Sequence, residues 1–320
     1  NFIVNSNPNP EVTKTALVAI IGRPSAGKST FLNTACQEAV SIVSPMPQTT
    51  RNAIRGIVNT SYGQLVFVDT PGYHDSEKKL NQKLKGVTES TLEGADAVLY
   101  VVDSTREPGD EEKITAELIK SYQKNMIVAI NKIDAVKKQS GARGLEAGIS
   151  NVNRTREFIK SSLPEISDER ILEMSAKNDI GINEVLKALY DISPVAPPMY
   201  VEDLYTDQDM KFRISEAIRG EAINRLEQEI PHAVYVDVAD LEFRNEGKKL
   251  WVRAFLCVER ESQKGIVIGK GASKIKEIRG ASLKTLNMIY PYKVELDLQV
   301  KVDKNWRQRD NTLQKLIDTK

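Results

Sequence analysis

The sequence predicts an α/β domain with a doubly wound, mostly parallel sheet, followed by a smaller α+β domain. Up to about residue 190, short Val/Ile/Leu-rich runs alternate with helix-like stretches, which is typical of parallel sheets covered by helices on both faces. The stretch SPVAPPMY at 193–200 then places three prolines in eight residues, which neither a helix interior nor a central strand tolerates. We therefore expect a flexible lead-in over 1–14, a first domain over 15–192, a linker over 193–204 and a second domain over 205–320.

The strands of the first domain are expected where continuous apolar runs have the length of a buried strand. Runs such as ALVAII and AVLYVV are apolar at every position and far too short to span a membrane. Helix-like stretches separate these runs, and the polar segment 137–150 is expected to be a mobile loop. The expected strands are 16–21, 64–69, 97–103, 125–131 and 171–175, and the expected helices are 28–37, 79–92, 110–123, 151–162 and 182–191.

The second domain is expected to follow a different order of elements. A helix at about 211–229 precedes two alternating strands at 234–243 and 248–260. Two short helical segments and a last strand at 293–302 follow, and an amphipathic helix comes after them. The order α-β-β-α-α-β predicts a three-stranded sheet backed by helices.

Composition excludes several classes of protein. The two cysteines, Cys36 and Cys257, have no partner spacing, which excludes a disulfide framework and a zinc cluster and fits a reducing compartment. The net charge of +1 hides a basic end, because residues 245–320 carry 17 Lys or Arg against 9 Asp or Glu. Charge alone leaves two interpretations open, a nucleic-acid partner and an ordinary solvated surface.

The stretch GRPSAGKST at 22–30 is the strongest motif of the first domain. It matches G-x-x-x-x-G-K-[ST] directly after an expected strand and at the start of an expected helix, where a phosphate-binding loop must lie. Backbone N–H groups of such a loop close on phosphates, the lysine reaches the β- and γ-phosphates, and the hydroxyl ligates Mg²⁺. The expected nucleotide contacts are Gly22, Arg23, Pro24, Ser25, Ala26, Gly27, Lys28, Ser29 and Thr30, with Ser29 also on the metal.

Three further stretches, each at the end of an expected strand, indicate which nucleotide is bound. In VFVDTPG the aspartate suits the Mg²⁺ shell, through a water, and the glycine N–H can sense the γ-phosphate. In NKID, Asp134 can accept two hydrogen bonds from guanine that adenine cannot donate, Asn131 braces the loops and Lys132 lies along the base. MSAK closes the other side of the base. These stretches predict a site for GTP and GDP made by Asp69, Thr70, Pro71, Gly72, Asn131, Lys132, Asp134, Ser175, Ala176 and Lys177.

Together, these four stretches resemble the translation-factor-type GTPases of the P-loop class. The loop PMPQTTRN at 45–52 resembles the switch of the Era/EngA/TrmE branch, which aligns the metal-binding threonine with Thr50. Ras-like switches have a water-positioning glutamine at the place of Tyr73, so we assign no catalytic side chain and expect slow unaided hydrolysis. Some relatives hold K⁺ with an asparagine at the place of Ser25, and we expect weak or absent stimulation by K⁺ here.

The stretch GIVIGKGASKIKEI at 265–278 resembles the core of a KH RNA-binding domain. In that family a tight glycine loop between two helices clamps the backbone of about four nucleotides. The last loop position is Ala272 rather than glycine, which the clamp tolerates if the backbone angle φ there is negative. The expected RNA contacts are Ile268, Gly269, Lys270, Gly271, Ala272, Lys274 and Lys276, with Trp306 and Arg307 further along the chain.

The whole chain resembles one family. The element order matches the type II KH topology, and over about 15–317 the chain resembles the Era family of GTPases, which assist small ribosomal subunit assembly. The resemblance implies that a GTP/GDP switch with Mg²⁺ controls binding to the 3′ end of small-subunit ribosomal RNA on the 30S subunit. It also implies a cytoplasmic protein with peripheral association at the inner membrane, and no obligate oligomer is inferred. Two alternatives stay open: an RNA-binding protein that holds GDP without cycling, and a membrane- or cell-cycle-linked switch.

Overall fold

The computed structural model describes residues 13–72, 79–138 and 142–317. By its internal contacts the chain forms two compact units. The first comprises Asn1–Ser41 and Thr50–Asp207, and the second comprises Ile42–Thr49 and Gln208–Lys320. The short segment Ile42–Thr49 therefore packs with the second unit, although the residues on either side of it belong to the first. Within the described ranges, no helix has both the length and the apolar character needed to cross a membrane.

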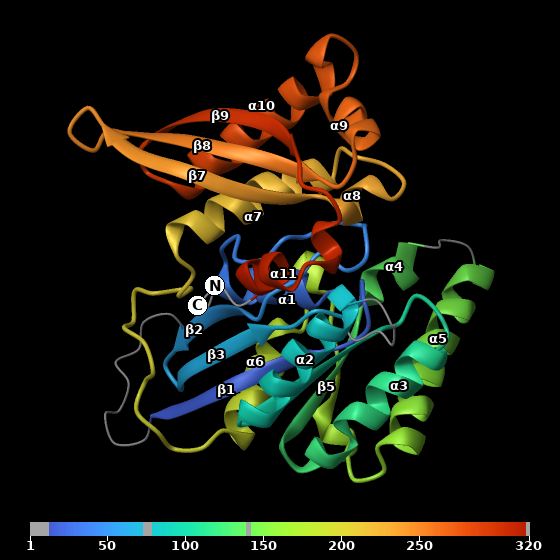
Figure 1. Cartoon of the computed structure of the whole chain (residues 1–320). Helices are drawn as coiled ribbons and strands as arrows, with labels where there is room; N and C mark the ends of the chain where they lie inside the picture. Colours follow the sequence, from blue (N-terminus) through green and yellow to red (C-terminus); the bar gives the residue numbers. More distant parts are fainter. Residues whose placement is uncertain (1–12, 73–78, 139–141, 318–320) are drawn as a thin grey trace. The chain divides into compact units, whose positions relative to one another are not determined.

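The first unit is built on one six-stranded sheet (Figure 1). All neighbouring strands pair in parallel except β2, which pairs antiparallel with β3. From β1 at the centre the chain adds strands on both sides, so the predicted doubly wound, mostly parallel sheet is confirmed. Across the sheet the strands lie in the order β2 (Ile54–Thr60), β3 (Gly63–Asp69), β1 (Lys14–Ile21), β4 (Ala97–Asp103), β5 (Met126–Asn131) and β6 (Ile171–Glu173).

Helices cover both faces of this sheet, which explains why its central strands are apolar throughout (Figure 1). On one face, Leu92, Ile119 and Ile159 come from three helices and join one buried cluster with β4 and β5. On the other face, Phe31 meets Phe67 edge-on, with ring centroids 5.3 Å apart. The helices of this unit are α1 (Lys28–Cys36), α2 (Lys79–Gly94), α3 (Asp110–Ile119), α4 (Ile133–Lys138), α5 (Ala142–Ser162) and α6 (Ile182–Ile192), with short 3₁₀ turns η1 (Lys120–Asn125), η2 (Asp168–Arg170) and η3 (Ala176–Asn178).

The sequence did not predict strand β2. Its residues, IRGIVNT, mix charged and polar side chains with the apolar ones, because the strand lies at the edge of the sheet and is only partly covered. Its register with β3 runs from Ile54 opposite Asp69 to Thr60 opposite Gly63. The strand therefore begins opposite Asp69, whose carboxylate was predicted to bind the metal through a water.

The predicted loop over 137–150 is wrong for most of its length. Helix α4 reaches Lys138 and α5 begins at Ala142, while residues 139–141 lie outside the described part of the chain. Thr155 and Ile159 of α5 are fully buried. Because helix growth from a formed turn is favourable, the packing of these two residues supports the rest of the helix.

The segment that follows the proline-rich stretch runs along the edge of the first sheet. The N–H of Ile57 donates to the carbonyl oxygen of Tyr205 (2.9 Å), and Thr206 Oγ1 donates to the carbonyl oxygen of Arg55 (2.7 Å). Arg55 Nη1 also pairs with Asp207 Oδ2 at 3.0 Å. The segment thus covers backbone groups that an edge strand would otherwise leave open.

The second unit has a three-stranded sheet with helices on one face (Figure 1). β7 and β8 are antiparallel, and β8 and β9 are parallel. Alternate residues such as Val252 and Leu296 point into a core that also holds Ile218, Val267 and Ile278 from three helices. The elements are α7 (Met210–Ile223), α8 (Ile230–Ala233), β7 (Tyr235–Arg244), β8 (Lys249–Val258), α9 (Glu261–Ile268), η4 (Lys270–Ala272), α10 (Ser273–Ile289), β9 (Lys293–Val302), η5 (Trp306–Gln308) and α11 (Asp310–Ile317).

This order confirms the predicted α+β class of the second unit, with one correction. The helix expected over 211–229 ends at Ile223, and a separate short helix, α8, follows. Gln228, between the two, has a φ of 57°, a left-handed conformation that a continuous helix does not contain.

Candidate nucleotide site and nucleic-acid interface

The loop between β1 and α1 wraps around the amine of Lys28. Lys28 Nζ donates to the carbonyl oxygens of Gly22 (2.8 Å) and Arg23 (3.0 Å). Gly27, which precedes the helix, has a φ of 103°, and a Cβ at Gly22 would lie only 2.4 Å from the carbonyl oxygen of Val101. Both glycines are therefore required by the backbone. The loop ends at a helix N-terminus, where free N–H groups and the helix dipole favour anions.

Lys28 is almost completely buried at the bottom of this loop. Burial lowers its pKa from the ordinary 10.5 to about 8, while the charges of Asp69 and Glu112 act in the opposite direction. A phosphate group placed against the loop would favour the charged amine, so the site holds a cation whose proton affinity depends on the ligand.

The carboxylate of Asp69 gathers three hydroxyl groups around one oxygen. Its Oδ2 accepts from Ser29 Oγ (2.6 Å), Ser41 Oγ (2.8 Å) and Thr50 Oγ1 (3.4 Å). Ser29 Oγ lies 3.1 Å from Thr50 Oγ1. The three residues predicted to serve the metal, Ser29, Thr50 and Asp69, are thus in direct contact, and Ser41 is a neighbour that the sequence did not reveal.

These groups fit a magnesium ion. Asp69 is fully buried, and burial raises its pKa although Lys28 and the neighbouring hydroxyls oppose the shift. Its Oδ1 has no hydrogen-bond partner among the described residues. A buried carboxylate with one oxygen unpartnered and three hydroxyls around the other supplies the hard oxygen donors that Mg²⁺ prefers.

Asn131 joins the phosphate loop to the loop that was predicted to hold the base. Its Nδ2 donates to the carbonyl oxygen of Ala26 (2.9 Å), and its Oδ1 accepts from the N–H of Ala176 (3.0 Å). Ser175 Oγ donates to Asp134 Oδ1 at 2.6 Å. The stretches NKID and MSAK, more than 40 positions apart, therefore form one surface with Asp134 on it.

A buried ionic network lies beside this surface, and the sequence did not predict it. Arg23 pairs with Asp103 (2.9 Å) and with Glu112 (2.8 Å), and all three side chains are nearly inaccessible. Tyr100 donates its hydroxyl to Glu112 Oε2 (2.5 Å), and Lys132 Nζ lies 2.9 Å from Asp103 Oδ2. The side chain of Arg23, predicted among the nucleotide contacts, is thus engaged elsewhere, which leaves only its main chain for that role.

Two carboxylates of this network respond differently to their surroundings. Although burial opposes it, hydrogen bonds from Thr105 and Lys132 hold the pKa of Asp103 below its ordinary value. Burial raises the pKa of Glu112 against the pull of Tyr100 and Arg23. Glu112 could have been found from helical spacing, because positions 112, 115, 116 and 119 form the buried face of α3.

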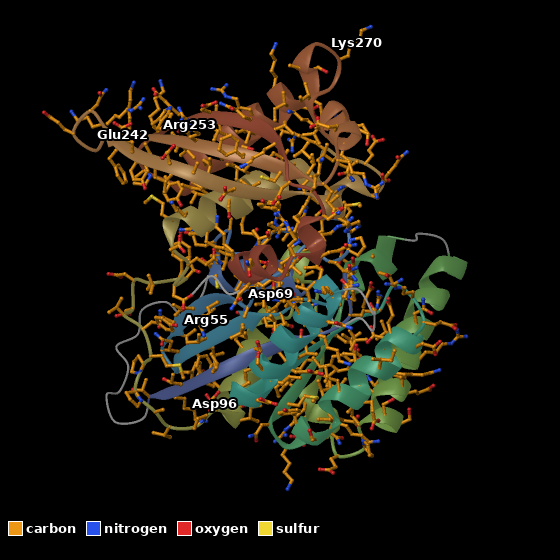
Figure 2. The ribbon with its side chains drawn as sticks, viewed as in Figure 1. Arg55, Asp69, Asp96, Glu242, Arg253 and Lys270 are labelled. Atoms are coloured by element: carbon orange, nitrogen blue, oxygen red, sulfur yellow. The ribbon has the colours of Figure 1, made fainter. Side chains whose placement is uncertain are left out.

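The glycine loop of the second unit lies between α9 and α10, as predicted. Gly269 and Gly271 have φ values of 72° and 61°. Ala272 has a φ of 62°, so the condition under which the clamp was expected to tolerate alanine, a negative φ, is not met. Lys270 projects outward from the tip of the loop (Figure 2). Lys276 is also exposed. The loop and its lysines form an accessible basic surface.

Two residues predicted to contact RNA have other roles in the structure. Trp306 is fully buried, donates its Nε1–H to the carbonyl oxygen of Ala233 (2.9 Å) and packs edge-on against Tyr235. It is a core residue and cannot stack on a base in this arrangement. Arg307 is partly exposed and pairs through Nε with Glu259 Oε2 at 3.0 Å.

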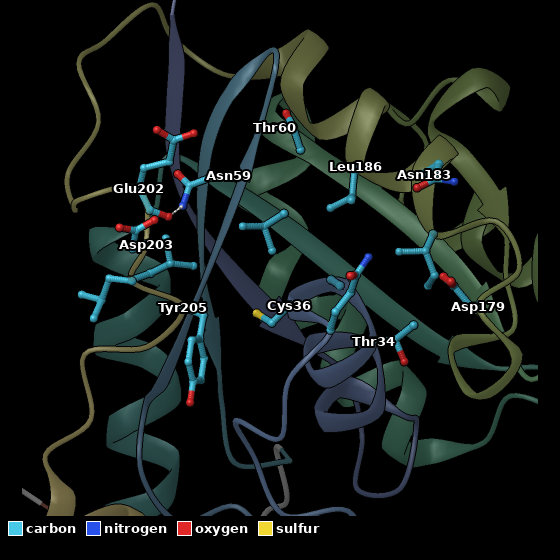
Figure 3. Close-up of a pocket in the computed structure, with 16 residues that line it drawn as sticks. Thr34, Cys36, Asn59, Thr60, Asp179, Asn183, Leu186, Glu202, Asp203 and Tyr205 are labelled. Atoms are coloured by element: carbon cyan, nitrogen blue, oxygen red, sulfur yellow. Dashed lines mark hydrogen bonds between the residues drawn. The ribbon is translucent and has the colours of Figure 1, made fainter. Parts of the chain in front are cut away.

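A pocket of about 420 Å³ lies in the first unit, beyond the last turn of α1 (Figure 3). It is lined by α1, β2, the first turns of α6 and residues 202–205, and by no described residue predicted to contact nucleotide. Thr34 Oγ1, in its wall, donates to the carbonyl oxygen of Ala176 (2.7 Å), so the pocket borders the back of the base loop. Burial raises the pKa of the Cys36 thiol in the pocket to about 12, which makes it a poor nucleophile.

Two family descriptions match parts of this chain. The family described as 50S ribosome-binding GTPase matches residues 17–132, and the KH domain family matches residues 229–307. The first range contains the phosphate loop and the Asp69 cluster, and the second contains the glycine loop.

Over nearly its whole length the chain is similar to proteins named GTPase Era. The protein of that name from Treponema denticola is 54% identical over 300 residues, which cover 94% of this chain and 98% of the relative. The one from Treponema pallidum is 44% identical over 304 residues, which cover 93% and 95%.

Solved structures give the same match. A tyrosine-to-alanine variant of Aquifex aeolicus Era bound to GDP·AlF4⁻ aligns with a TM-score of 0.85 at 31% identity, over 95% of this chain and 99% of that one. Era in complex with MgGDPNP and nucleotides 1506–1542 of 16S ribosomal RNA aligns with a TM-score of 0.85 at 30% identity, over 95% and 98%.

Proposed function

This chain belongs to the GTPase Era family, and we propose that it is a GTP-controlled RNA-binding switch of 30S subunit assembly. The first unit binds and hydrolyses GTP, and the KH domain of the second unit binds the 3′ end of small-subunit ribosomal RNA. The observation that carries the proposal is that one chain holds both the Asp69 cluster beneath a phosphate loop and an exposed KH loop. A similar Era protein has been solved with MgGDPNP and a 16S ribosomal RNA segment.

The reaction is attack of water on the γ-phosphate, which positioning and electrostatics promote without a covalent intermediate. Lys28 and the N–H groups of the phosphate loop bind the β- and γ-phosphates. Ser29, Thr50 and Asp69 would hold Mg²⁺, which when bound offsets the charge of the phosphates. Tyr73, at the place of the water-positioning glutamine, lies outside the described residues, and we assign no general base.

Discrimination between nucleotides falls to Asp134. Its carboxylate is held by Ser175 at the surface that Asn131 assembles, where two oxygens can accept from guanine N1–H and N2–H₂. Adenine would leave these acceptors unpaired, which costs more free energy than the loss of an ordinary contact.

On the RNA side, the proposal is supported by the accessible backbone of the loop Gly269–Ala272 and by the exposed lysines around it. A glycine-rich turn lets phosphates approach the main chain closely, and the lysines contribute attraction that depends on salt. We also propose a cytoplasmic location with association only at the membrane surface, on the family resemblance and on the two free cysteines.

Fluorescence anisotropy of a labelled RNA with the sequence of the small-subunit rRNA 3′ end tests the proposal. The full chain is titrated at fixed salt with GDP or with GDPNP and Mg²⁺, beside a scrambled RNA of the same length. We expect tighter, sequence-selective binding in the GDPNP state. Equal binding of both RNAs, or equal affinity in both nucleotide states, would refute the switch on RNA.

A pair of lysine variants separates the KH loop from general basic charge. Lys270→Gln should weaken binding several-fold and reduce the salt slope by about one, as loss of one phosphate contact does. Lys293→Gln removes the same charge from an exposed position at the start of β9. It should leave the affinity close to wild type, and equal losses in both variants would contradict a role for the loop.

A further inference from the structure

The segment that directly precedes the switch threonine, Thr50, packs with the KH unit. Residues Ile42–Thr49 cluster with the second unit, whereas Thr50 belongs to the first and faces Ser29 and Asp69 there. Met46 packs against the core of the second unit. The chain therefore passes from one unit to the other between two consecutive residues, Thr49 and Thr50.

Helix α7 makes the contacts that hold this segment. Arg219 Nη2 donates to the carbonyl oxygen of Thr49 at 2.6 Å. At the next position, a Cβ on Gly220 would lie 3.4 Å from the side chain of Ile42, so the segment packs closely against the helix. Arg219 thus binds the end of the segment, and Gly220 leaves room for its beginning.

The side chain of Arg219 is held in one orientation by a neighbouring carboxylate. It is 2% exposed, and Glu216, one turn earlier, accepts from its Nε and Nη2 at 2.6 Å each. This fork leaves Nη2 aimed at the Thr49 carbonyl. Nη1 has no acceptor among the described residues, and a buried donor without an acceptor costs free energy.

The hydrogen bond from Arg219 to Thr49 affects the predicted metal ligand, Thr50, through the covalent chain. The carbonyl of Thr49 and the N–H of Thr50 belong to the same planar peptide group. Fixing that carbonyl therefore limits the directions in which Thr50 Oγ1 can point. Thr50 Oγ1 in turn lies 3.1 Å from Ser29 Oγ and 3.4 Å from Asp69 Oδ2, the other predicted metal residues.

Helix α7 is also tied to the helix that follows the glycine loop. Thr285 Oγ1 of α10 donates to Glu221 Oε1 of α7 at 2.5 Å, and Arg225 Nε, just beyond the end of α7, lies 3.6 Å from Glu277 Oε1. Because α10 begins at Ser273, directly after the loop, a change at the loop has a mechanical route to α7.

We propose that Arg219 is a positioning residue that couples the KH unit to GTP-dependent metal binding by holding the Thr49 peptide. The inference rests on the proposed function and specifies how the two activities communicate. Its consequence is that Arg219 supports the GTP state, in which Thr50 is needed, far more than the GDP state, in which it is not.

The test uses full-length Arg219→Gln, with Lys211→Gln as the control. Lys211 is exposed on the same helix, and the control removes the same charge. A second protein, Arg219→Gln with Glu216→Gln, avoids leaving a carboxylate without its partner and serves if the single variant does not fold. A circular dichroism spectrum like that of wild type establishes that a variant is folded.

The first readout needs no RNA. With fluorescent nucleotides and Mg²⁺, the Arg219→Gln proteins should bind GDPNP about tenfold more weakly than wild type, with GDP affinity unchanged. Raising the Mg²⁺ concentration should restore part of the GDPNP affinity. Equal changes for GDP and GDPNP, or none for either, would overturn the proposal.

The second readout is the ratio of the RNA dissociation constants measured with GDP and with GDPNP. In Arg219→Gln this ratio should fall towards one, while Lys211→Gln keeps the wild-type ratio. An unchanged ratio in Arg219→Gln would overturn the coupling. If the wild-type ratio is itself one, the switch on RNA fails, and the nucleotide readout still decides the role of Arg219.

Discussion

Arg23 Nη2 lies 2.9 Å from Asp103 Oδ2, with both side chains less than 5% exposed, although the residues are 80 positions apart. The pair joins the phosphate loop to the end of β4. Since Lys132 shares the same Asp103 oxygen, one carboxylate serves both the phosphate loop and the base loop.

Replacing this carboxylate should destabilise the first unit. Asp103→Asn leaves Arg23 with Glu112 alone and Lys132 without its ion pair, and we expect a loss of about 3 kcal/mol, as for other broken buried pairs. Urea unfolding of the nucleotide-free protein, followed by circular dichroism, measures the loss.

The control for this change is Asp110→Asn. Its ion pair with Lys113 is exposed, and such pairs contribute less than about 1 kcal/mol. Both tryptophans, Trp251 and Trp306, lie in the second unit, so their fluorescence should report a transition that Asp103→Asn leaves unchanged. A loss no larger than that of Asp110→Asn would show that the network is not structural.

Nucleotide binding should take up protons above pH 8. The pKa of Lys28 is about 8 in the folded protein against 10.5 ordinarily, so the unfolded chain binds more protons between these values. The free energy of unfolding therefore increases as the pH rises from about 8 to 10.5. Below that range Lys28 is charged in the folded protein as well, and burial of the charge is unfavourable. Bound phosphates favour the charged form and draw a proton onto Lys28.

Titration calorimetry of GDP at pH 8.5, in two buffers with different ionisation enthalpies, measures this uptake. At pH 7, where Lys28 already holds its proton, the uptake should be much smaller. Binding heats that do not depend on the buffer at pH 8.5 would contradict the linkage.

Asp134→Asn should change which base the site accepts. Xanthine offers an acceptor where guanine has its N2–H₂ donor, so an amide at this position favours xanthine nucleotides. Loss of two hydrogen bonds to a charged acceptor should weaken GTP binding by about 3 kcal/mol or more, roughly a hundredfold. The matched control is Asp179→Asn, because Asp179 is an exposed carboxylate shortly after the stretch MSAK. Unchanged GTP affinity in Asp134→Asn would refute base recognition by this carboxylate.

Ala272→Gly should stabilise the second unit. The φ of 62° costs alanine about 1 to 2 kcal/mol, and the greater freedom of glycine in the unfolded chain offsets about half of that gain. We expect a net gain of about 0.5 to 1 kcal/mol in urea unfolding followed by tryptophan fluorescence.

The same substitution inside α10 gives the opposite sign. Ala281→Gly lies in regular helix and should cost about 1 kcal/mol. If Ala272→Gly is as destabilising as Ala281→Gly, the left-handed conformation at position 272 is not under strain.

Hydrolysis should respond weakly to K⁺ because Ser25 is too short to hold the ion as an asparagine would. Ser25 is exposed and has a φ of 63°, a conformation that asparagine adopts more readily than most residues. Ser25→Asn should therefore be tolerated and should make the rate in KCl several-fold higher than in NaCl. A several-fold stimulation of the wild type by K⁺ would contradict this prediction.

The sequence by itself determined the parts of the site that are local. The phosphate loop needs Gly22, Gly27 and Lys28 within a few positions of each other, because one turn of backbone must close around a phosphate. The ends of parallel strands meet at one edge of a sheet, so the order of the motifs also implied that Asp69 and Asn131 would lie near that loop.

Tertiary structure alone decided what depends on burial and on distant partners. The sequence did not show that Trp306 is a core residue, that Glu112 rather than its acidic neighbours faces Arg23, or that Ala272 adopts a positive φ. Nor did it show that Arg219 reaches Thr49, 170 positions away. Local patterns specify backbone shape and the chemistry of adjacent residues, whereas the pairing of two distant side chains depends on packing that no short stretch encodes.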